Sequence, residues 1–373
     1  MKKLRLVTIL GTRPELIRLS ITIKKCDKLF DHILIHTGQN YDYELNQIFF
    51  DQLDIRKPDY FLDAAGENLG QTLGNIISKS YDILESLKPD SILVLGDTNS
   101  SLCLLSAKRL KIPIFHMEAG NRCFDQNVPE EINRKIADHL ADVNLSYTEN
   151  SRRYILSEGF RKDHVFNTGS PLVEVLNYFE NKIDNSEILK KLGVDQKKYI
   201  VASIHREENL DIGKNFKQII EALNLVVKKY DFPLVFSTHP RTKEKLKQIK
   251  TKESPKINFI KPLGFFDYVK LQKESFIALS DSGTISEESS IINFPAVSIR
   301  TSTERPEAID YGTILLGNID KDSIMQSVEV ALKTFRRGYK QIPSGYKVLN
   351  SSDRVIKIIQ GYTKIINREI WRK

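Results

Sequence analysis

The sequence predicts an α/β fold built from two doubly wound parallel sheets that face a cleft. Three observations indicate this fold. Apolar β-branched runs alternate with stretches of helical periodicity, the alternation starts again in the second half of the 373-residue chain, and small or charged residues follow most predicted strands directly. Each half is long enough to bury a core of its own.

The first half, predicted as one domain over residues 1–170, contains continuous apolar runs. Continuous rather than alternating hydrophobicity is expected of strands that are covered on both faces. The predicted strands are Leu4–Leu10, His32–His36, Ser91–Leu95, Ile112–Met117 and Val143–Tyr147. Helices are predicted between them over Asn68–Lys88 and Asn99–Leu110.

The second half, predicted as a domain over residues 171–353, repeats this pattern after the apolar runs thin out in Gly169–Gln196. Its predicted strands are Tyr199–Ile204, Pro233–Ser237, Ile257–Ile260, Phe276–Ser280, Ala296–Ile299 and Thr313–Leu316. Its predicted helices are Gly213–Tyr230, Ser282–Ile292 and Lys321–Phe335. The segment Arg354–Trp371 has apolar residues at helical spacing, which predicts an amphipathic helix that needs a surface to pack on.

The composition excludes several classes of protein. The chain is 28% charged and 40% hydrophobic, as ordinary globular proteins are. Its three cysteines form no CxxC pair, which argues against a disulfide framework and a structural zinc site and favours a reducing cytoplasm. No stretch approaches the roughly 18 apolar residues of a membrane span. The net charge of +8 suits an anionic ligand but is too diffuse to predict binding of nucleic acid.

Carboxylates at strand ends are the main chemical signal. Asp97 and Glu118 directly follow two consecutive predicted strands, and Glu130 and Glu131 open a predicted helix a short way on. Carboxylates that converge at one sheet edge suit general acid–base catalysis. No histidine cluster or metal-ligand spacing accompanies them, so we expect neither a metal nor another cofactor. An acidic first turn also complements the helix dipole, so one of Glu130 and Glu131 could be a cap alone.

Cationic side chains at other strand ends predict an anion-binding site. Arg13 and Arg18 open the helix after the first strand, where backbone N–H groups and guanidinium groups suit phosphate. The alternative for Arg18 is a solvated helix residue. His205-Arg206 and His239-Pro240-Arg241 follow two successive strands of the second half, which favours a diphosphate clamp over two structural histidines.

Two further segments carry candidate functions. The small-residue turn Ser282-Gly283-Thr284 could hold a phosphate through its N–H groups, and Glu288 could take a ribose diol. A Ser-Gly turn alone is weak evidence, but Thr303–Ala308 after the next strand strengthens it. Cys123 lies in a loop with no histidine paired to it in sequence, which predicts a packing or wall residue rather than a nucleophile.

These motifs, taken in order, resemble the non-hydrolysing UDP-N-acetylglucosamine 2-epimerases over essentially the whole chain. The matching motifs are Gly11–Glu15, Gly96–Thr98, His116–Gly120, Pro129–Arg134, His205–Asn209, Asp281–Gly283 with Glu287-Glu288, and Thr303–Ala308. The resemblance implies two Rossmann-like domains in a fold of glycosyltransferase-B type, with the last helix, 354–373, packing back on the first domain. It also implies a homodimer.

The resemblance further implies a mechanism. A base removes the proton on carbon 2 of the sugar, UDP leaves by elimination to give a glycal, and UDP returns to carbon 1 as carbon 2 is protonated on its opposite face. Asp97, Glu118 and Glu130 would be the acid–base groups, and Arg13 and His205 would stabilise the departing diphosphate. The residues that would bind substrate are Arg18, Arg134, His239, Leu263, Tyr268 on the uracil, Ser282, Gly283, Thr284, Glu288 on the ribose, and Arg305.

Departures from the common family pattern resemble one subgroup. Asn121–Asp125 replaces a common Gly-Leu-Arg, and Gln39–Tyr43 replaces a common Gln-His-Arg. These variants resemble the capsule and O-antigen enzymes that convert UDP-2-acetamido-2,6-dideoxy-β-L-talose to UDP-N-acetyl-L-fucosamine, which is the expected reaction. The alternatives are UDP-N-acetylglucosamine 2-epimerase itself, a UDP-sugar glycosyltransferase and a non-catalytic nucleotide-sugar sensor.

Overall fold

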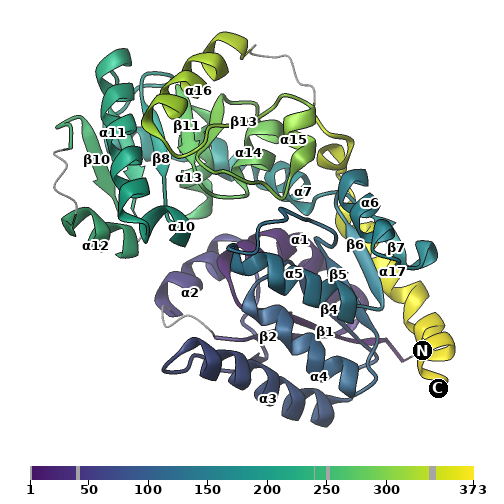
Figure 1. The fold of residues 1–373 in the computed structure, drawn as a ribbon. Helices are drawn as coiled ribbons and strands as arrows, with labels where there is room; N and C mark the ends of the chain where they lie inside the picture. Colours follow the sequence, from purple (N-terminus) through teal and green to yellow (C-terminus); the bar gives the residue numbers. More distant parts are fainter. Residues whose placement is uncertain (1, 39–42, 239, 249–252, 336–341) are drawn as a thin grey trace. The chain divides into compact units, whose positions relative to one another are not determined.

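The computed structural model describes residues 2–38, 43–238, 240–248, 253–335 and 342–373 of the chain. The chain divides into two compact units (Figure 1). Unit 1 consists of Met1–Tyr178 with Ser344–Lys373, and unit 2 consists of Phe179–Pro343. Each unit is an α/β domain built around one parallel sheet, which confirms the predicted fold class.

The described part of unit 1 contains a seven-stranded parallel sheet in the order β3-β2-β1-β4-β5-β6-β7. Its strands are β1 (Arg5–Leu10), β2 (Asp31–His36), β3 (Tyr60–Phe61), β4 (Ser91–Leu95), β5 (Ile114–Met117), β6 (Val143–Ser146) and β7 (Val165–Asn167). Its helices are α1 (Arg13–Leu29), α2 (Tyr43–Gln52), α3 (Leu69–Leu87), η1 (Asn99–Leu102), α4 (Cys103–Arg109), α5 (Pro129–Leu140), α6 (Glu149–Ser157), η2 (Lys162–His164), α7 (Pro171–Tyr178), η3 (Ser344–Lys347), α17 (Ser351–Ile366) and η4 (Asn367–Trp371).

The described part of unit 2 contains a six-stranded parallel sheet in the order β10-β9-β8-β11-β12-β13. Its strands are β8 (Ile200–Ser203), β9 (Leu234–Ser237), β10 (Ile257–Ile260), β11 (Ile277–Ser280), β12 (Ala296–Ser298) and β13 (Leu315–Leu316). Its helices are α8 (Glu180–Asp184), α9 (Ile188–Leu192), α10 (Glu207–Leu210), α11 (Gly213–Tyr230), α12 (Pro240–Gln248), α13 (Phe265–Lys273), α14 (Ile285–Ile292), α15 (Pro306–Asp310) and α16 (Lys321–Thr334).

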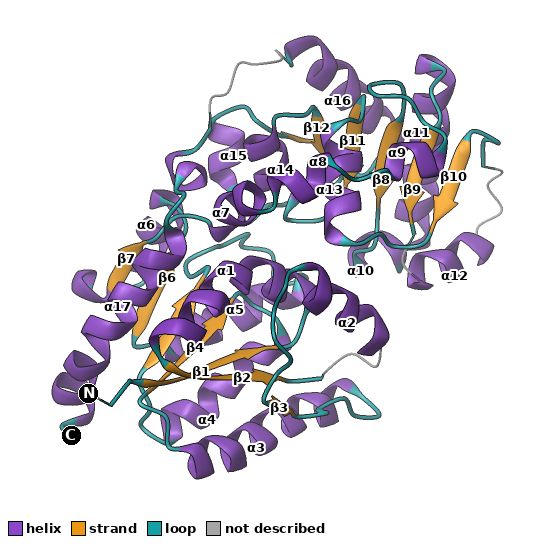
Figure 2. Cartoon of the chain, turned by 180° about the vertical axis from the view of Figure 1, so that it is seen from behind, coloured by secondary structure: helices purple, strands orange, loops and turns teal. Residues whose placement is uncertain are grey.

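Helices cover both faces of each sheet (Figure 2), so the central strands are apolar on both sides. In unit 1 the core on one face joins strand residues such as Val7 and Ile92 to Ile76 of α3 and Leu104 of α4. In unit 2 one core packs α11 and α16 on the sheet, and a second core packs α9, α13 and α14 on the other face. These cores fix the strands from which the functional loops emerge.

The predicted strands are all present, and most differ from prediction by one or two residues at their ends. Two strands of unit 1, β3 and β7, were not predicted. Tyr60–Phe61 is only two residues long and exposed, and Val165–Asn167 is three residues long, so neither gives an apolar run that a sequence pattern can reveal. The predicted C-terminal helix begins earlier, at Ser351, and changes to a π-helical turn after Ile366.

The C-terminal segment is fastened to unit 1 before its helix begins, which explains why the unit boundary falls at Pro343 and not at the predicted residue 353. The carbonyl of Gly345 accepts a 2.8 Å hydrogen bond from the Ser170 N–H. The Cα of Gly345 lies against the backbone of Tyr147. The first boundary falls after Tyr178, not at residue 170, because α7 packs on α1.

The helix α17 is held by a buried carboxylate of α7. Glu174 accepts hydrogen bonds from the Ser352 N–H and hydroxyl at 2.9 and 2.6 Å, and it pairs with Lys25 of α1 at 3.1 Å. Lys25 also pairs with Asp353 at 2.7 Å. Three helices of unit 1 are thus tied together by one cluster, and Figure 1 shows α17 in yellow along this unit.

Replacing Gly345 with alanine should destabilise unit 1, because a Cβ there would lie 2.2 Å from the backbone oxygen of Tyr147. Overpacking of this kind costs about 1–3 kcal/mol, so we expect a lower melting temperature by calorimetry. Gly361 is the matched control. It lies in α17 with no atom within 4 Å of an added Cβ, and alanine there should stabilise the helix by about 0.5–1 kcal/mol. Equal melting temperatures for the two variants would contradict this packing.

Candidate functional site

The order of each sheet reverses beside its first strand, between β1 and β4 in unit 1 and between β8 and β11 in unit 2. Ligands of doubly wound sheets bind beyond the carboxyl ends of the strands at such points. Most of the candidate residues lie in the loops and helix starts that follow these strands. Each unit therefore presents its own set of candidate side chains at this edge of its sheet.

Asp97 follows β4 and is held by an arginine of α5. Arg134 donates to Asp97 Oδ2 through Nε at 3.0 Å and through Nη2 at 2.6 Å. The arginine is buried, whereas 22% of the Asp97 side chain is exposed. Arg134 thus fixes the carboxylate of Asp97 with two hydrogen bonds, and this arginine supports a candidate acid–base group.

Glu118 follows β5 in a left-handed backbone conformation with φ of +65°, which is uncommon for residues other than glycine. Its carboxylate receives a 3.3 Å hydrogen bond from Asn121 Nδ2 and lies 3.6 Å from Arg18 Nη1. A Cβ on Gly96 would lie 3.5 Å from Glu118 Oε2, so this carboxylate lies beside the residue that precedes Asp97. The structure thus brings the two candidate carboxylates to one edge of the sheet.

Arg18 is buried, so the alternative of a solvated helix residue is wrong. Its guanidinium carbon lies 5.8 Å from the ring centre of Tyr147, in addition to the ion pair with Glu118. Arg13 lies at the start of the same helix, with its guanidinium 5.6 Å from the ring centre of Phe49. Both cations therefore belong to the first helix after β1.

The two glutamates at the start of α5 have different surroundings. Glu131 is buried and accepts hydrogen bonds from the N–H groups of Cys123 and Phe124 at 3.1 and 3.2 Å. Burial raises its pKa, but these hydrogen bonds and the charge of Arg134, 2.6 Å away, outweigh burial and hold the pKa below its ordinary value. Glu131 is thus a structural anion. Glu130 is half-buried one position earlier in the same turn.

The thiol of Cys123 lies against this cluster. Its Sγ is 3.3 Å from Glu131 Oε2 and 3.6 Å from Arg134 Nη1, and burial raises its pKa. A raised pKa lowers the fraction of the nucleophilic thiolate. The contacts therefore agree with the predicted wall residue.

A buried chain of ionic contacts supports the loop after β5, and the sequence did not predict it. Asp138 accepts from Arg122 Nη1 at 2.7 Å and from the Gly120 N–H at 3.1 Å, and His116 Nδ1 lies 2.9 Å from it. Arg122 also bonds Glu158 with two donors at 2.7 Å each. The only signal in the sequence was the motif that contains His116, because Asp138 within α5 and Glu158 directly after α6 belong to no unusual pattern.

A second unrecognised carboxylate joins the loops after β1 and β4. Glu15 Oε2 accepts from the Gly11 N–H at 3.0 Å and from the Thr12 hydroxyl at 2.7 Å, and Oε1 accepts from the Thr98 hydroxyl at 3.0 Å. Burial raises the pKa of Glu15 to about 7, although each of these hydrogen bonds lowers it. Glu15 belongs to a motif of the resemblance, but no role for it was predicted from the sequence.

In unit 2, Asp281 joins the loop after β11 to the loop after β8. This fully buried carboxylate accepts from the N–H groups of His205 and Arg206 at about 3.0 Å and from Asn209 Nδ2 at 3.0 Å. His205 Nδ1 lies 3.3 Å from Asp281 Oδ1, and 45% of the His205 side chain is exposed. Asp281 therefore sets the position of His205 while leaving its ring accessible.

The predicted phosphate turn is stabilised by its own hydroxyl groups. Ser282 Oγ and Thr284 Oγ1 lie 3.0 Å apart, and Thr284 donates to Glu288 Oε1 at 3.0 Å. Gln272 donates to the other oxygen of Glu288 at 2.7 Å. Glu288 is thus attached to the turn, as a shared phosphate and ribose site would require.

Tyr268 and Leu263 pack against one core of unit 2. The Tyr268 hydroxyl is hydrogen-bonded to Ser203, and burial raises its pKa. Stacking of Tyr268 on uracil stays a prediction. His239 lies outside the described residues, as do residues 39–42 of the variant motif after β2.

Arg305 lies against the turn of Ser282, Gly283 and Thr284. Its Nη1 donates to Glu304 at 2.6 Å and its Nε to the fully buried Glu287 at 3.1 Å. A Cβ on Gly283 would lie 2.0 Å from Glu304 Oε1, so only glycine fits between the turn and this pair. The structure thus gives Arg305 two anionic partners in addition to any ligand.

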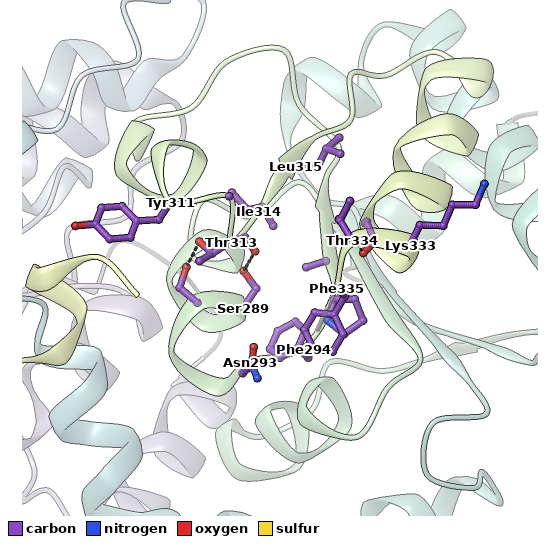
Figure 3. A pocket seen from close by; sticks show the side chains of 15 residues that line it. Ser289, Asn293, Phe294, Tyr311, Thr313, Ile314, Leu315, Lys333, Thr334 and Phe335 are labelled. Atoms are coloured by element: carbon purple, nitrogen blue, oxygen red, sulfur yellow. Dashed lines mark hydrogen bonds between the residues drawn. The ribbon is translucent and has the colours of Figure 1, made fainter. Parts of the chain in front are cut away.

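A cavity of about 660 Å³ in unit 2 lies at the opposite edge of the sheet (Figure 3). Ala296 and Leu315 at the starts of β12 and β13 line it, together with residues at the ends of α14 and α16. Figure 3 shows Ser289 and Thr313 hydrogen-bonded to each other there. The cavity contains none of the candidate residues, so its size does not identify it as their site.

Among the described residues, no group of three His, Cys, Asp or Glu side chains is arranged to hold a metal ion. Within the same residues, no helix has the length and hydropathy needed to cross a membrane.

Comparisons with known proteins agree with this geometry. A family model described as UDP-N-acetylglucosamine 2-epimerase matches residues 24–360. The solved structure of a UDP-N-acetylglucosamine 2-epimerase from Rickettsia bellii is 46% identical, covers 100% of both chains and has a TM-score of 0.93. A Methanocaldococcus jannaschii UDP-GlcNAc 2-epimerase, solved in complex with UDP-GlcNAc and UDP, is 33% identical, covers 96% of this chain and 100% of its own, and has a TM-score of 0.89.

A relative with a different named substrate is similar over nearly the same length. The UDP-2,3-diacetamido-2,3-dideoxy-D-glucuronate 2-epimerase of Pseudomonas aeruginosa is 33% identical in an alignment of 334 residues that covers 88% of this chain and 92% of the relative. The structural likenesses confirm the expected glycosyltransferase-B type of fold. Because the family model spans most of its length, this chain belongs to the UDP-N-acetylglucosamine 2-epimerase family.

Proposed function

We propose that this protein is an isomerase that inverts carbon 2 of a UDP-2-acetamido sugar. The observation that carries the proposal is the pair of carboxylates after adjacent strands, each held by a buried arginine: Asp97 by Arg134 and Glu118 by Arg18. Inversion needs one group to remove a proton and another to return it from the opposite face. A glycosyltransferase needs no such pair at carbon 2, so this observation favours the epimerase over that alternative.

The proposed mechanism assigns proton transfer to unit 1 and nucleotide binding to unit 2. Asp97, Glu118 and Glu130 supply the base and the acid for carbon 2. Arg13 and His205 stabilise the diphosphate as the bond to carbon 1 breaks, because donors aimed at developing charge lower the barrier. In unit 2 the turn at Ser282 takes phosphate and Glu288 takes the ribose. The hydrogen bonds of the turn to Glu288 support this division.

The specific sugar we propose is UDP-2-acetamido-2,6-dideoxy-β-L-talose, converted to UDP-N-acetyl-L-fucosamine for capsule or O-antigen synthesis in the cytoplasm. The variant loop supports this choice, because Asn121 contacts Glu118 itself and Arg122 anchors the loop to Asp138 and Glu158. Relatives of similar identity are named for different sugars, so substrate choice varies within this fold. The second candidate is UDP-N-acetylglucosamine 2-epimerase itself. We also propose a homodimer, as the resemblance implies.

The purified protein should turn over the 6-deoxy-L-talose nucleotide and have little activity on UDP-N-acetylglucosamine. The reason is that the variant loop connects the two segments that carry Glu118 and Glu130. Epimerisation can be followed as exchange of the carbon 2 proton in deuterated water, by NMR, with each sugar in turn. Equal or faster exchange with UDP-N-acetylglucosamine would favour the second candidate instead.

Amide variants of the three carboxylates should abolish proton transfer while preserving shape. We expect Asp97→Asn, Glu118→Gln and Glu130→Gln each to lower the epimerisation rate by several orders of magnitude, with at least one variant still releasing UDP and a 2-acetamido glycal. The products can be separated by anion-exchange chromatography. Glu187→Gln, an exposed carboxylate of unit 2, is the control that should retain activity. If all three variants stay active, the assignment of the carboxylates is wrong.

Removal of either proposed diphosphate donor should slow catalysis without unfolding the protein. Arg13→Ala and His205→Ala should each lower kcat by about 100-fold, the usual effect of losing one donor to a developing anion. Their melting temperatures should stay close to that of the wild type, because neither side chain lies in an apolar core. Arg153→Ala removes an arginine with 74% of its side chain exposed and should leave kcat unchanged. Near wild-type kcat for either variant would remove that residue from the mechanism.

A further inference from the structure

Glu15 connects the two loops on either side of the switch point in unit 1. One of its oxygens receives the Gly11 N–H and the Thr12 hydroxyl, next to Arg13, and the other receives the Thr98 hydroxyl, next to Asp97. The side chain is buried, and no ion pair with it occurs in the described part of the chain. A buried anion without a cation is costly, and the three hydrogen bonds offset part of that cost.

The three hydrogen bonds to Glu15 match its ionised carboxylate, although burial opposes ionisation. The Gly11 N–H can only donate, and the Thr12 and Thr98 hydroxyls both donate, so the three groups require acceptors on both oxygens. A proton on Oε1 would have to be donated to the Thr98 hydroxyl, which already accepts from the Ser100 N–H at 3.2 Å. The hydrogen bond between the loops would then run in the opposite direction, and the Thr98 hydroxyl would lose Glu15 as its acceptor.

Unit 2 contains the same arrangement at its own switch point. Asp281 is fully buried and accepts from the backbone N–H groups of His205 and Arg206, which belong to the loop after the neighbouring strand. Each sheet therefore uses one buried carboxylate to hold two adjacent loops. This repetition indicates that joining the loops is the role of Glu15 too.

We propose that Glu15 is a positioning residue whose ionised carboxylate aligns Arg13 with Asp97 for the reaction. The proposal rests on the proposed function, because the alignment matters for proton transfer and diphosphate departure at those two side chains. Glu15 does not touch the reacting atoms. It acts through the loop positions, where a displacement of about 1 Å can cost about 100-fold in rate.

Several ionisable groups surround Glu15. Cys103 of α4 faces it, since the charge of Glu15 contributes to raising the pKa of that thiol. Asp97 adjoins the Thr98 partner, and Arg13 and Arg18 lie on the same helix as Glu15. Burial moves the pKa of Glu15 from its ordinary 4.5 to about 7, so its ionisation falls within the range where enzyme activity is measured.

The expected pH dependence has opposite signs for activity and stability. Activity should rise as the pH increases through about 7, because the ionised form aligns the loops. Stability should change the other way. The folded protein binds this proton more tightly than the unfolded chain, so the stabilisation is complete below about pH 4.5 and is lost as the pH rises to about 7.

The test uses Glu15→Gln, which imitates the protonated side chain at every pH. At pH 8 its kcat should be at least about 10-fold lower than that of the wild type, with KM little changed. The difference in kcat should shrink towards pH 5.5. The rise of kcat near pH 7, the limb expected in the wild-type pH profile, should therefore be absent from the profile of the variant. The melting temperature of the variant at pH 8 should equal or exceed that of the wild type, since the variant carries no buried charge.

Glu174→Gln is the matched control, because Glu174 is also a buried, hydrogen-bonded carboxylate of unit 1 but lies between α7 and α17. It should melt at a lower temperature and keep the wild-type pH profile. If Glu15→Gln keeps the limb near pH 7, or melts below the wild type at both pH values, the positioning role is overturned. Absence of epimerisation by the wild type with every UDP-2-acetamido sugar would instead overturn the proposed function, and the role of Glu15 with it.

Discussion

The need to hold charged side chains at the carboxyl edges of the sheets, partly out of water, is the constraint on which both sites depend. A buried charge is costly unless hydrogen bonds, and in most cases an opposite charge, compensate for the lost water. Unit 1 meets this condition by sharing cations, since Arg134 bonds both Asp97 and Glu131. Unit 2 meets it through Arg305, which bonds both Glu287 and Glu304. The functional loops are therefore held by ionic contacts as well as by the apolar cores.

Sharing one guanidinium couples groups that lie apart in the sequence. Arg134 fixes Asp97 after β4, and Glu131, on the same arginine, binds the backbone N–H groups of Cys123 and Phe124 in the variant loop. A shift of that loop would therefore disturb the carboxylate of Asp97. Through this coupling, a change in the variant loop can reach Asp97 although the loop contains no candidate acid–base group.

The sequence predicted the fold well because each buried strand is a continuous apolar run, and such runs are visible one at a time. It also predicted the groups that project from strand ends, such as Asp97, Glu118 and His205, because parallel strands deliver such groups to one edge. It did not predict Asp138 as a partner of Arg122, or Thr98 as a partner of Glu15. Those contacts join residues on different elements, and their pairing depends on how the helices pack, which no local pattern records.

The variant loop after β5 has a buried, anchored end and an exposed tip, which differ in how freely they can change. The loop that begins at Asn121 is fixed at one end by Arg122, which is fully buried between Asp138 and Glu158. Its tip at Phe124 has 66% of its surface exposed and a left-handed φ of +57°. A substitution at the tip changes what faces solvent and leaves the ion pairs intact, whereas one at Arg122 would remove the guanidinium that bonds both Asp138 and Glu158. Substitutions should therefore be tolerated at the tip of the loop, while the anchored end keeps Asn121 beside Glu118.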